Sequence, residues 1–165
     1  IIYSIAVSLR DLGMTMAPQN AFQTLLGLET LSLRMKKHVS NARKIANWLE
    51  QHPKIDKVTY ARLKSSKYYY LAKSVLPKGA GALFTISLKE GYEACIKMIN
   101  KLNLFSHVSN LGDTRSLIIH PASTVHRQLT EQQQINAGLA PNVIRLSIGI
   151  EDPKDLIDDL KQALE

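Results

Sequence analysis

The sequence predicts an α/β two-layer sandwich: a mixed or mostly antiparallel sheet covered by helices on one face. Strand-like and helix-like segments alternate along most of the chain, which is typical of this class. Segment 143–150 indicates which face of the sheet the helices cover, because its apolar side chains occupy every second position. With 165 residues, 45% of them hydrophobic and 21% charged, the chain can bury a core as one domain.

A long apolar stripe at helical spacing predicts one helix over residues 18–52. Pro18 suits its first turn, where a missing N–H costs nothing, and His52-Pro53 ends it. Alternation then predicts strands at 57–60, 82–88, 104–108, 117–120 and 143–150. Between and after these strands, the pattern predicts helices at 67–76, 90–102 and 130–138, and a last helix that begins at Asp152-Pro153. Thr130 and Gln133 have the spacing of a capping box.

Composition excludes several classes of protein. The one cysteine, Cys95, rules out an internal disulfide and a cysteine-based metal cage, and no Asn-x-Ser/Thr sequon occurs, which favours a cytoplasmic origin. No apolar run is long enough to span a membrane. The net charge of +7 is spread along the chain, with its densest cluster at 36–38, so nucleic-acid binding is not expected.

The polar face of strand 143–150 is the first candidate site. Arg145, Ser147 and Gly149 lie on the face opposite the apolar side chains, so a guanidinium is flanked by small residues that leave room for a ligand. An arginine fork suits a carboxylate or phosphate held by two hydrogen bonds. The alternative is a structural ion pair with a neighbour such as Glu151 or Asp113.

The turn 109–116 is the second candidate, because Asn110 could hold an anion or an amide there, although the turn could equally be an ordinary loop. His120 and His126 have no metal-site spacing, so His120 is predicted to be packed and structural and no metal is expected. Cys95, on an apolar helix face, is predicted to be buried and inert. The tyrosines at 68–70 are interpreted as packing residues.

Several ordered motifs resemble the Cys/Met-metabolism family of pyridoxal-phosphate (PLP) enzymes. Its C-terminal signature is matched by Ser116-Leu117-Ile118-Ile119-His120-Pro121-Ala122-Ser123-Thr124 and by the segment 144–152. Segments 9–18, 27–31 and 78–81 continue the match upstream. The resemblance covers essentially the whole chain and implies the C-terminal domain of a fold-type-I PLP transferase, preceded by a long connecting helix.

Within the family, the form of segment 110–117 is similar to that of the O-acetylhomoserine sulfhydrylases. The resemblance implies replacement of the acetate of O-acetylhomoserine by sulfide or a small thiol, in homocysteine and methionine synthesis. It places Arg145 at the arginine that binds the substrate α-carboxylate, and Asn110 at a second contact to that carboxylate. Val125 departs from the family pattern, which usually has a threonine there.

The resemblance also implies what this chain does not carry. The family's catalytic lysine lies in a Ser-x-Thr-Lys stretch, which does not occur here, so the chain alone is expected to be inactive and to bind no PLP. Residues 1–17 are then interpreted as the tail of the PLP domain, 18–52 as the connecting helix and 53–165 as the C-terminal α/β domain.

The partners implied are a small amino-acid substrate, no nucleic acid, no membrane and, for the full-length enzyme, a homotetramer. Two alternative functions stay open. The same domain could belong to a cystathionine γ-synthase or to a methionine or cystathionine γ-lyase. A non-catalytic interaction module is the alternative of a different class.

Overall fold

The computed structural model describes all residues from 1 to 165, in two compact units, Ile1–Leu33 and Arg34–Glu165. The first unit contains a π-helix η1 (Ser4–Leu9), a short helix α1 (Arg10–Leu12) and helix α2 (Pro18–Glu29), none of which buries a residue. Pro18 occupies the first turn of α2, as expected. No helix of the structure is both long and apolar enough to cross a membrane.

The expectation of one uninterrupted helix over 18–52 is corrected by the structure. Helix α2 ends at Glu29, and α3 (Leu31–Glu50) begins after Thr30, whose φ of −100° and ψ of 0° lie outside the helical region. The amide of Thr30 donates to the carbonyl of Leu28, two residues back. Threonine has a lower helix propensity than the straight-chain residues, which fits an interruption at this position.

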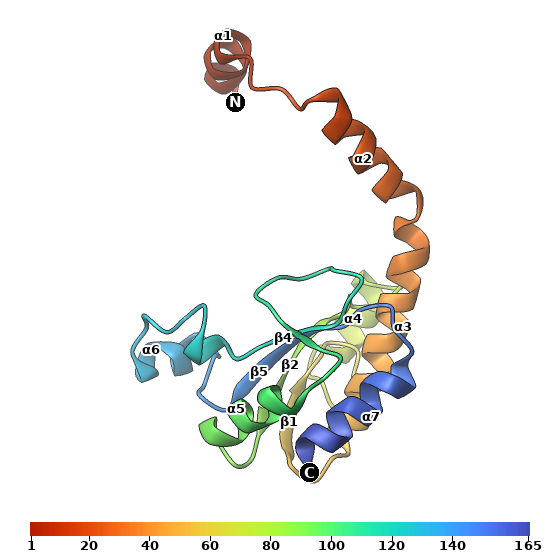
Figure 1. The fold of residues 1–165 in the computed structure, drawn as a ribbon, viewed down its shortest axis with the longest axis vertical. Coiled ribbons are helices and arrows are strands. Elements are labelled where there is room, and N and C mark those ends of the chain that lie inside the picture. The colour runs from red at the N-terminus through yellow and green to blue at the C-terminus, as the bar shows by residue number, and fades with distance from the viewer. The chain divides into compact units, whose positions relative to one another are not determined.

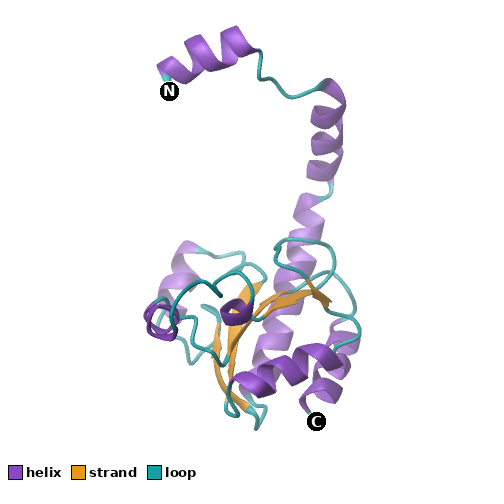
Figure 2. Ribbon diagram, turned by 60° about the vertical axis from the view of Figure 1, so that its left-hand side comes forward, coloured by secondary structure: helices purple, strands orange, loops and turns teal.

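The second unit is built on a five-stranded sheet in the order β1-β2-β5-β4-β3 (Figure 1). The strands are β1 (Ile55–Thr59), β2 (Leu83–Leu88), β3 (Ser106–His107), β4 (Leu117–Ile119) and β5 (Val143–Ser147). All neighbouring strands run antiparallel except β3 and β4, which are parallel, so the predicted mixed sheet is confirmed. In Figure 2 the strands form one twisted layer with helices and long loops beside it.

The remaining helices follow the predicted order. They are α4 (Tyr69–Val75), α5 (Tyr92–Lys101), the 3-10 turn η2 (Pro121–Ser123), α6 (Glu131–Asn136) and α7 (Pro153–Leu164). The predicted capping box is present, because the Thr130 hydroxyl accepts from the Gln133 amide and the Gln133 side chain accepts from the Thr130 amide. Asp152 caps α7 by accepting from the amide of Lys154 at 2.8 Å.

The core lies between one face of the sheet and the helices α3, α5 and α7. The sheet and the residue that follows β5 contribute Phe84, Ile86, Leu88, Ile144, Leu146 and Ile148 to it. The helices contribute residues such as Ile45, Leu49, Met98, Leu156 and Leu160. Alternation along β5 therefore sorts its side chains as predicted, with the apolar set against the helices. The helical part of this core begins at His38 and Asn41, so α3 contributes to the sandwich itself.

Cys95 is fully buried on the apolar face of α5, and burial raises the pKa of its thiol to about 12. At pH 8.5 the folded protein should therefore keep this thiol protonated, and a thiol-specific reagent should label it at least about a hundredfold more slowly than in denaturant. The stability gained from burying the neutral thiol is fully present below a pH of about 8.5 and declines as the pH rises toward 12. Labelling of the folded protein at the denatured rate would contradict this assignment.

Candidate functional site

Strand β5 places Arg145 at the centre of the sheet on the face away from the core. Its neighbours in the paired strands are Thr85 of β2 and Ile119 of β4. Arg145 is partly exposed, whereas Ile144 and Leu146 on either side of it have no exposed surface. The apolar face of β5 thus packs in the core, and the Arg145 guanidinium lies on the opposite face of the sheet.

The loop 109–116 lies against this same face and brings Asn110 to Arg145. Arg145 Nη2 donates to the carbonyl oxygen of Asn110 at 3.3 Å. Two positions further along β5, the Ser147 hydroxyl accepts from the amide of Gly112 at 3.2 Å. The two site residues predicted from sequence, far apart in the chain, are therefore neighbours in the structure.

The side chain of Asn110 keeps its amino group available. Its Oδ1 accepts from the amide of Leu111 at 2.8 Å, as in a local turn, and its Nδ2 makes no hydrogen bond within the chain. An amide nitrogen can donate two hydrogen bonds, so Asn110 can offer donors to an anion that Arg145 holds.

The structure does not contain the ion pair that was weighed as the alternative role of Arg145. The Glu151 carboxylate accepts from the amide and the hydroxyl of Ser116, at 2.6 and 2.9 Å. Asp113 accepts from the amide of Arg115 at 3.0 Å, and this hydrogen bond is the main cause that lowers the pKa of its carboxyl. The hydrogen-bond partner of the Arg145 guanidinium is the Asn110 carbonyl, and no carboxylate of the chain neutralises it.

The expectation that Ser147 and Gly149 leave room for a ligand is wrong, because the chain itself fills that space. A Cβ on Gly149 would lie 2.3 Å from the carbonyl oxygen of Thr114 and 2.6 Å from the carbonyl carbon of Arg115. The loop backbone thus passes directly over Gly149, and the amide of Ile150 donates to Thr114 at 2.9 Å. The room that remains for a ligand lies beside Arg145 and Asn110.

Sequence reasoning missed the group that ties the loop to the strand. It treated Glu151 only as an ion partner for Arg145, whereas the structure uses both of its carboxylate oxygens to hold Ser116. The Ser116 hydroxyl also accepts from the amide of Gly149 at 2.9 Å. Ser116 and Glu151 both lie within the motifs that carry the family resemblance, and this was the feature of the sequence that could have indicated their importance.

The other predicted residues have structural roles. His120 is fully buried, with ring nitrogens 2.9 Å from the Ser123 hydroxyl and 2.7 Å from the Pro141 carbonyl, as predicted. No cluster of three or more possible metal ligands exists. Val125 is exposed, and the preceding Thr124 hydroxyl donates to the carbonyl of His120 at 2.7 Å. Tyr68 and Tyr70 are exposed at the surface.

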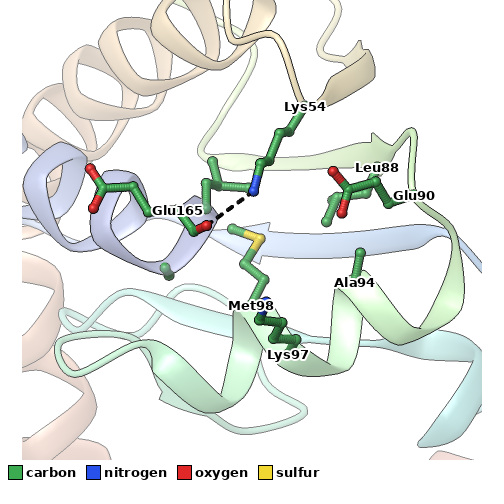
Figure 3. Close-up of a pocket in the computed structure, with 9 residues that line it drawn as sticks. Lys54, Leu88, Glu90, Ala94, Lys97, Met98 and Glu165 are labelled. Carbon is green, nitrogen blue, oxygen red and sulfur yellow. Dashed lines mark hydrogen bonds between the residues drawn. The ribbon is translucent and has the colours of Figure 1, made fainter.

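A small cavity of about 30 Å³ lies elsewhere, among residues of β2, α5 and α7 (Figure 3). Lys54 points across it and donates to the backbone oxygen of Glu165 at 3.2 Å, and Met98 lines its floor. Its volume is about that of one water molecule. The cavity includes neither Arg145 nor Asn110 and is too small for an amino-acid substrate.

Comparison with known proteins identifies the family. The profile of a family described as Cys/Met metabolism PLP-dependent enzyme matches residues 2–165. The chain belongs to this family. An O-acetyl-L-homoserine sulfhydrylase of Leptospira meyeri is 48% identical over 95% of this chain and 36% of its own length. An L-methionine gamma-lyase of Fusobacterium nucleatum subsp. nucleatum is 41% identical over 96% of this chain and 40% of its own.

Solved structures agree with this assignment to the Cys/Met metabolism family. A Campylobacter jejuni protein described as an O-acetylhomoserine (thiol)-lyase, solved with a pyridoxyl-lysine phosphate, matches with a TM-score of 0.90 and 48% identity. The match covers 99% of this chain and 39% of that one. The chain thus spans little more than a third of the length of the relatives it matches.

The residues at this site fit the substrate of a PLP enzyme better than the cofactor. In the Campylobacter jejuni structure the pyridoxyl group is joined to a lysine, but β2, β4, β5 and the loop 109–116 contain no lysine. What they offer is one guanidinium without a carboxylate partner and a free amide group, which suit a carboxylate. The site therefore does not itself fit PLP.

Gly149→Ala tests whether the loop depends on its close approach to β5. The added Cβ would overlap backbone atoms of residues 114–115, so we expect a loss of about 1–3 kcal/mol of unfolding free energy, measured by denaturant titration. Gly27→Ala is the control, because a Cβ there meets nothing within 4 Å. An equal free energy of unfolding in the two variants would show that the loop can move away from Gly149 at little cost.

Proposed function

We propose that this chain is the part of a PLP-dependent O-acetylhomoserine sulfhydrylase that binds the substrate α-carboxylate. In the proposed reaction, the acetate of O-acetylhomoserine leaves and sulfide or a small thiol takes its place. The observation that carries the proposal is Arg145, a guanidinium on the open face of the sheet with no carboxylate partner in the chain. Arg145 and Asn110 are the proposed substrate-binding residues.

Arg145 would hold and orient the carboxylate end of the substrate. Its contact to the Asn110 carbonyl uses one N–H, and the planar fork has further donors for two carboxylate oxygens. The Nδ2 of Asn110 would donate a further hydrogen bond from the adjacent loop. Two donors from separate segments fix the direction of the carboxylate, which sets where the rest of the substrate lies.

The methionine γ-lyase relative supports a second candidate, the same domain in a γ-lyase. Both enzymes would need the same carboxylate contact, so products must decide between them. The whole enzyme should be assayed with O-acetylhomoserine plus sulfide, and separately with methionine and with cystathionine. Homocysteine from the first mixture supports the sulfhydrylase, whereas methanethiol or cysteine release without added sulfide supports the lyase.

The wider organisation is part of the same proposal. Residues 1–17 would form the end of the PLP domain, 18–52 the connection and 53–165 the C-terminal domain of a cytoplasmic homotetramer. Helix α3 buries side chains from His38 onward. This burial supports a C-terminal domain that begins within residues 18–52 and not at residue 53. Size measurement of the whole enzyme by light scattering tests the tetramer.

Arg145→Ala in the whole enzyme should reduce kcat/KM for O-acetylhomoserine at least about tenfold, because a hydrogen bond to a charged group contributes about 1.5–3 kcal/mol. PLP content should be nearly unchanged. Arg145→Lys should recover only part of the activity, since an ammonium does not reproduce the planar fork. A kcat/KM within twofold of wild type, together with a lower melting temperature, would show that Arg145 is structural.

Asn110→Ala should raise KM with a smaller effect than Arg145→Ala. The substitution removes the Nδ2 donor, but the backbone carbonyl that holds Arg145 stays in place. This removes one neutral donor to a carboxylate, so the expected loss lies at the lower end of the range for such hydrogen bonds, about 1.5 kcal/mol or roughly tenfold. Steady-state kinetics at varied O-acetylhomoserine measure this, and an unchanged KM would remove Asn110 from the site.

A further inference from the structure

We propose that Glu151 is a positioning residue for carboxylate recognition: its side chain holds the loop 109–116 where Asn110 and Arg145 can act together. This inference rests on the proposed function, because it assigns a device to the same site. Glu151 lies between β5 and α7 and has no contact with Arg145 itself. It acts through Ser116, the last residue of the loop.

The hydrogen bonds around Ser116 require a group that only accepts. The Ser116 amide and hydroxyl both donate to Glu151, one to each carboxylate oxygen. The same hydroxyl accepts from the amide of Gly149 at 2.9 Å, so its single proton is committed to Glu151. A carboxylate satisfies both donors at once, whereas a side-chain amide has one acceptor oxygen and would turn N–H donors toward the other.

Glu151 is in turn held in place by helix α3. Asn41 Nδ2 donates to the backbone carbonyls of Gly149 and Glu151, at 3.1 and 2.8 Å. A ring nitrogen of His38 lies 2.7 Å from the carbonyl of Ile148. The backbone that carries Glu151 is therefore fixed on one side by two buried side chains of α3, and the Glu151 carboxylate reaches the loop on the other.

The loop has no comparable set of anchors nearer to Asn110. Nearer to Asn110 it is held by three single hydrogen bonds, from the Ile150 amide to the Thr114 carbonyl, from the Gly112 amide to Ser147 and from Arg145 to the Asn110 carbonyl. Residues 110–115 are otherwise exposed. Loosening Ser116 should therefore let Asn110 and its carbonyl shift, and small misplacement of a binding group lowers activity strongly.

The test is whether Glu151→Gln weakens recognition of the α-carboxylate specifically. In the whole holoenzyme, kcat/KM is measured for O-acetylhomoserine and for its α-carboxamide, which lacks the negative charge. The ratio of the two values reports carboxylate recognition. We expect Glu151→Gln, a substitution of equal size, to lower this ratio about tenfold while PLP content stays at the wild-type level.

Asp159→Asn is the matched control. Asp159 is a buried carboxylate that, like Glu151, accepts from backbone amides, here those of Asn103 and Leu104, but it belongs to α7 and has no bond to the loop 109–116. The Asp159→Asn substitution should lower the melting temperature and leave the ratio of kcat/KM for the carboxylate to that for the carboxamide unchanged. A general loss of stability would instead lower the ratio equally in both variants, and that result would overturn the positioning role.

A second variant separates positioning from local unfolding. Ser116→Ala removes the hydroxyl that links Glu151 to Gly149, and the double variant Ser116→Ala/Glu151→Gln should lower the ratio no further than the more damaging of the two single variants does. If the double variant instead lowers the ratio by the product of the two single effects, Ser116 and Glu151 do not act through one shared contact, and the positioning role is wrong.

Arg145→Ala shows which proposal fails. If Arg145→Ala strongly lowers the ratio and Glu151→Gln leaves it at the wild-type value, the positioning role is wrong and the proposed function stands. If Arg145→Ala leaves the ratio unchanged, the proposed function is wrong, and the role of Glu151 is wrong with it.

Discussion

The close approach of the loop backbone to Gly149 is the constraint on which the site depends. Residues 114 and 115 occupy the space that any side chain at position 149 would need. Because of this approach, Ser116 can bond to the Gly149 amide and to Glu151 at the same time. The loop is thereby fixed at the end of β5, and Asn110 lies beside Arg145 as a consequence.

The electrostatics of the site follow from how its carboxylates are used. Glu151 is committed to Ser116, and Asp113 bonds within its own turn, so neither neutralises Arg145. Leaving a guanidinium without a partner is inexpensive here because the side chain remains partly exposed. No carboxylate of the chain therefore neutralises the charge of Arg145, as its proposed role in carboxylate binding requires.

Much of the fold could be predicted because local patterns determine it. The alternation in β5, the cap at Asp152 and the capping box at Thr130 all depend on residues close in sequence. The interruption at Thr30 was not predictable in this way, since the apolar stripe continues across it. The bonds from Glu151 to Ser116 join residues 35 positions apart, and no spacing rule reports such a contact.

The two faces of β5 separate stability from recognition. Ile144, Leu146 and Ile148 are completely buried against the helices, whereas Arg145 and the loop contact to Ser147 lie on the other face. The loop 109–116 therefore lies outside the core, and it is bound to the end of the strand through Ser116. Gly149 and Glu151 hold the loop against the strand that carries Arg145, so the exposed residues 111–115 can change without reaching the buried side chains of the core.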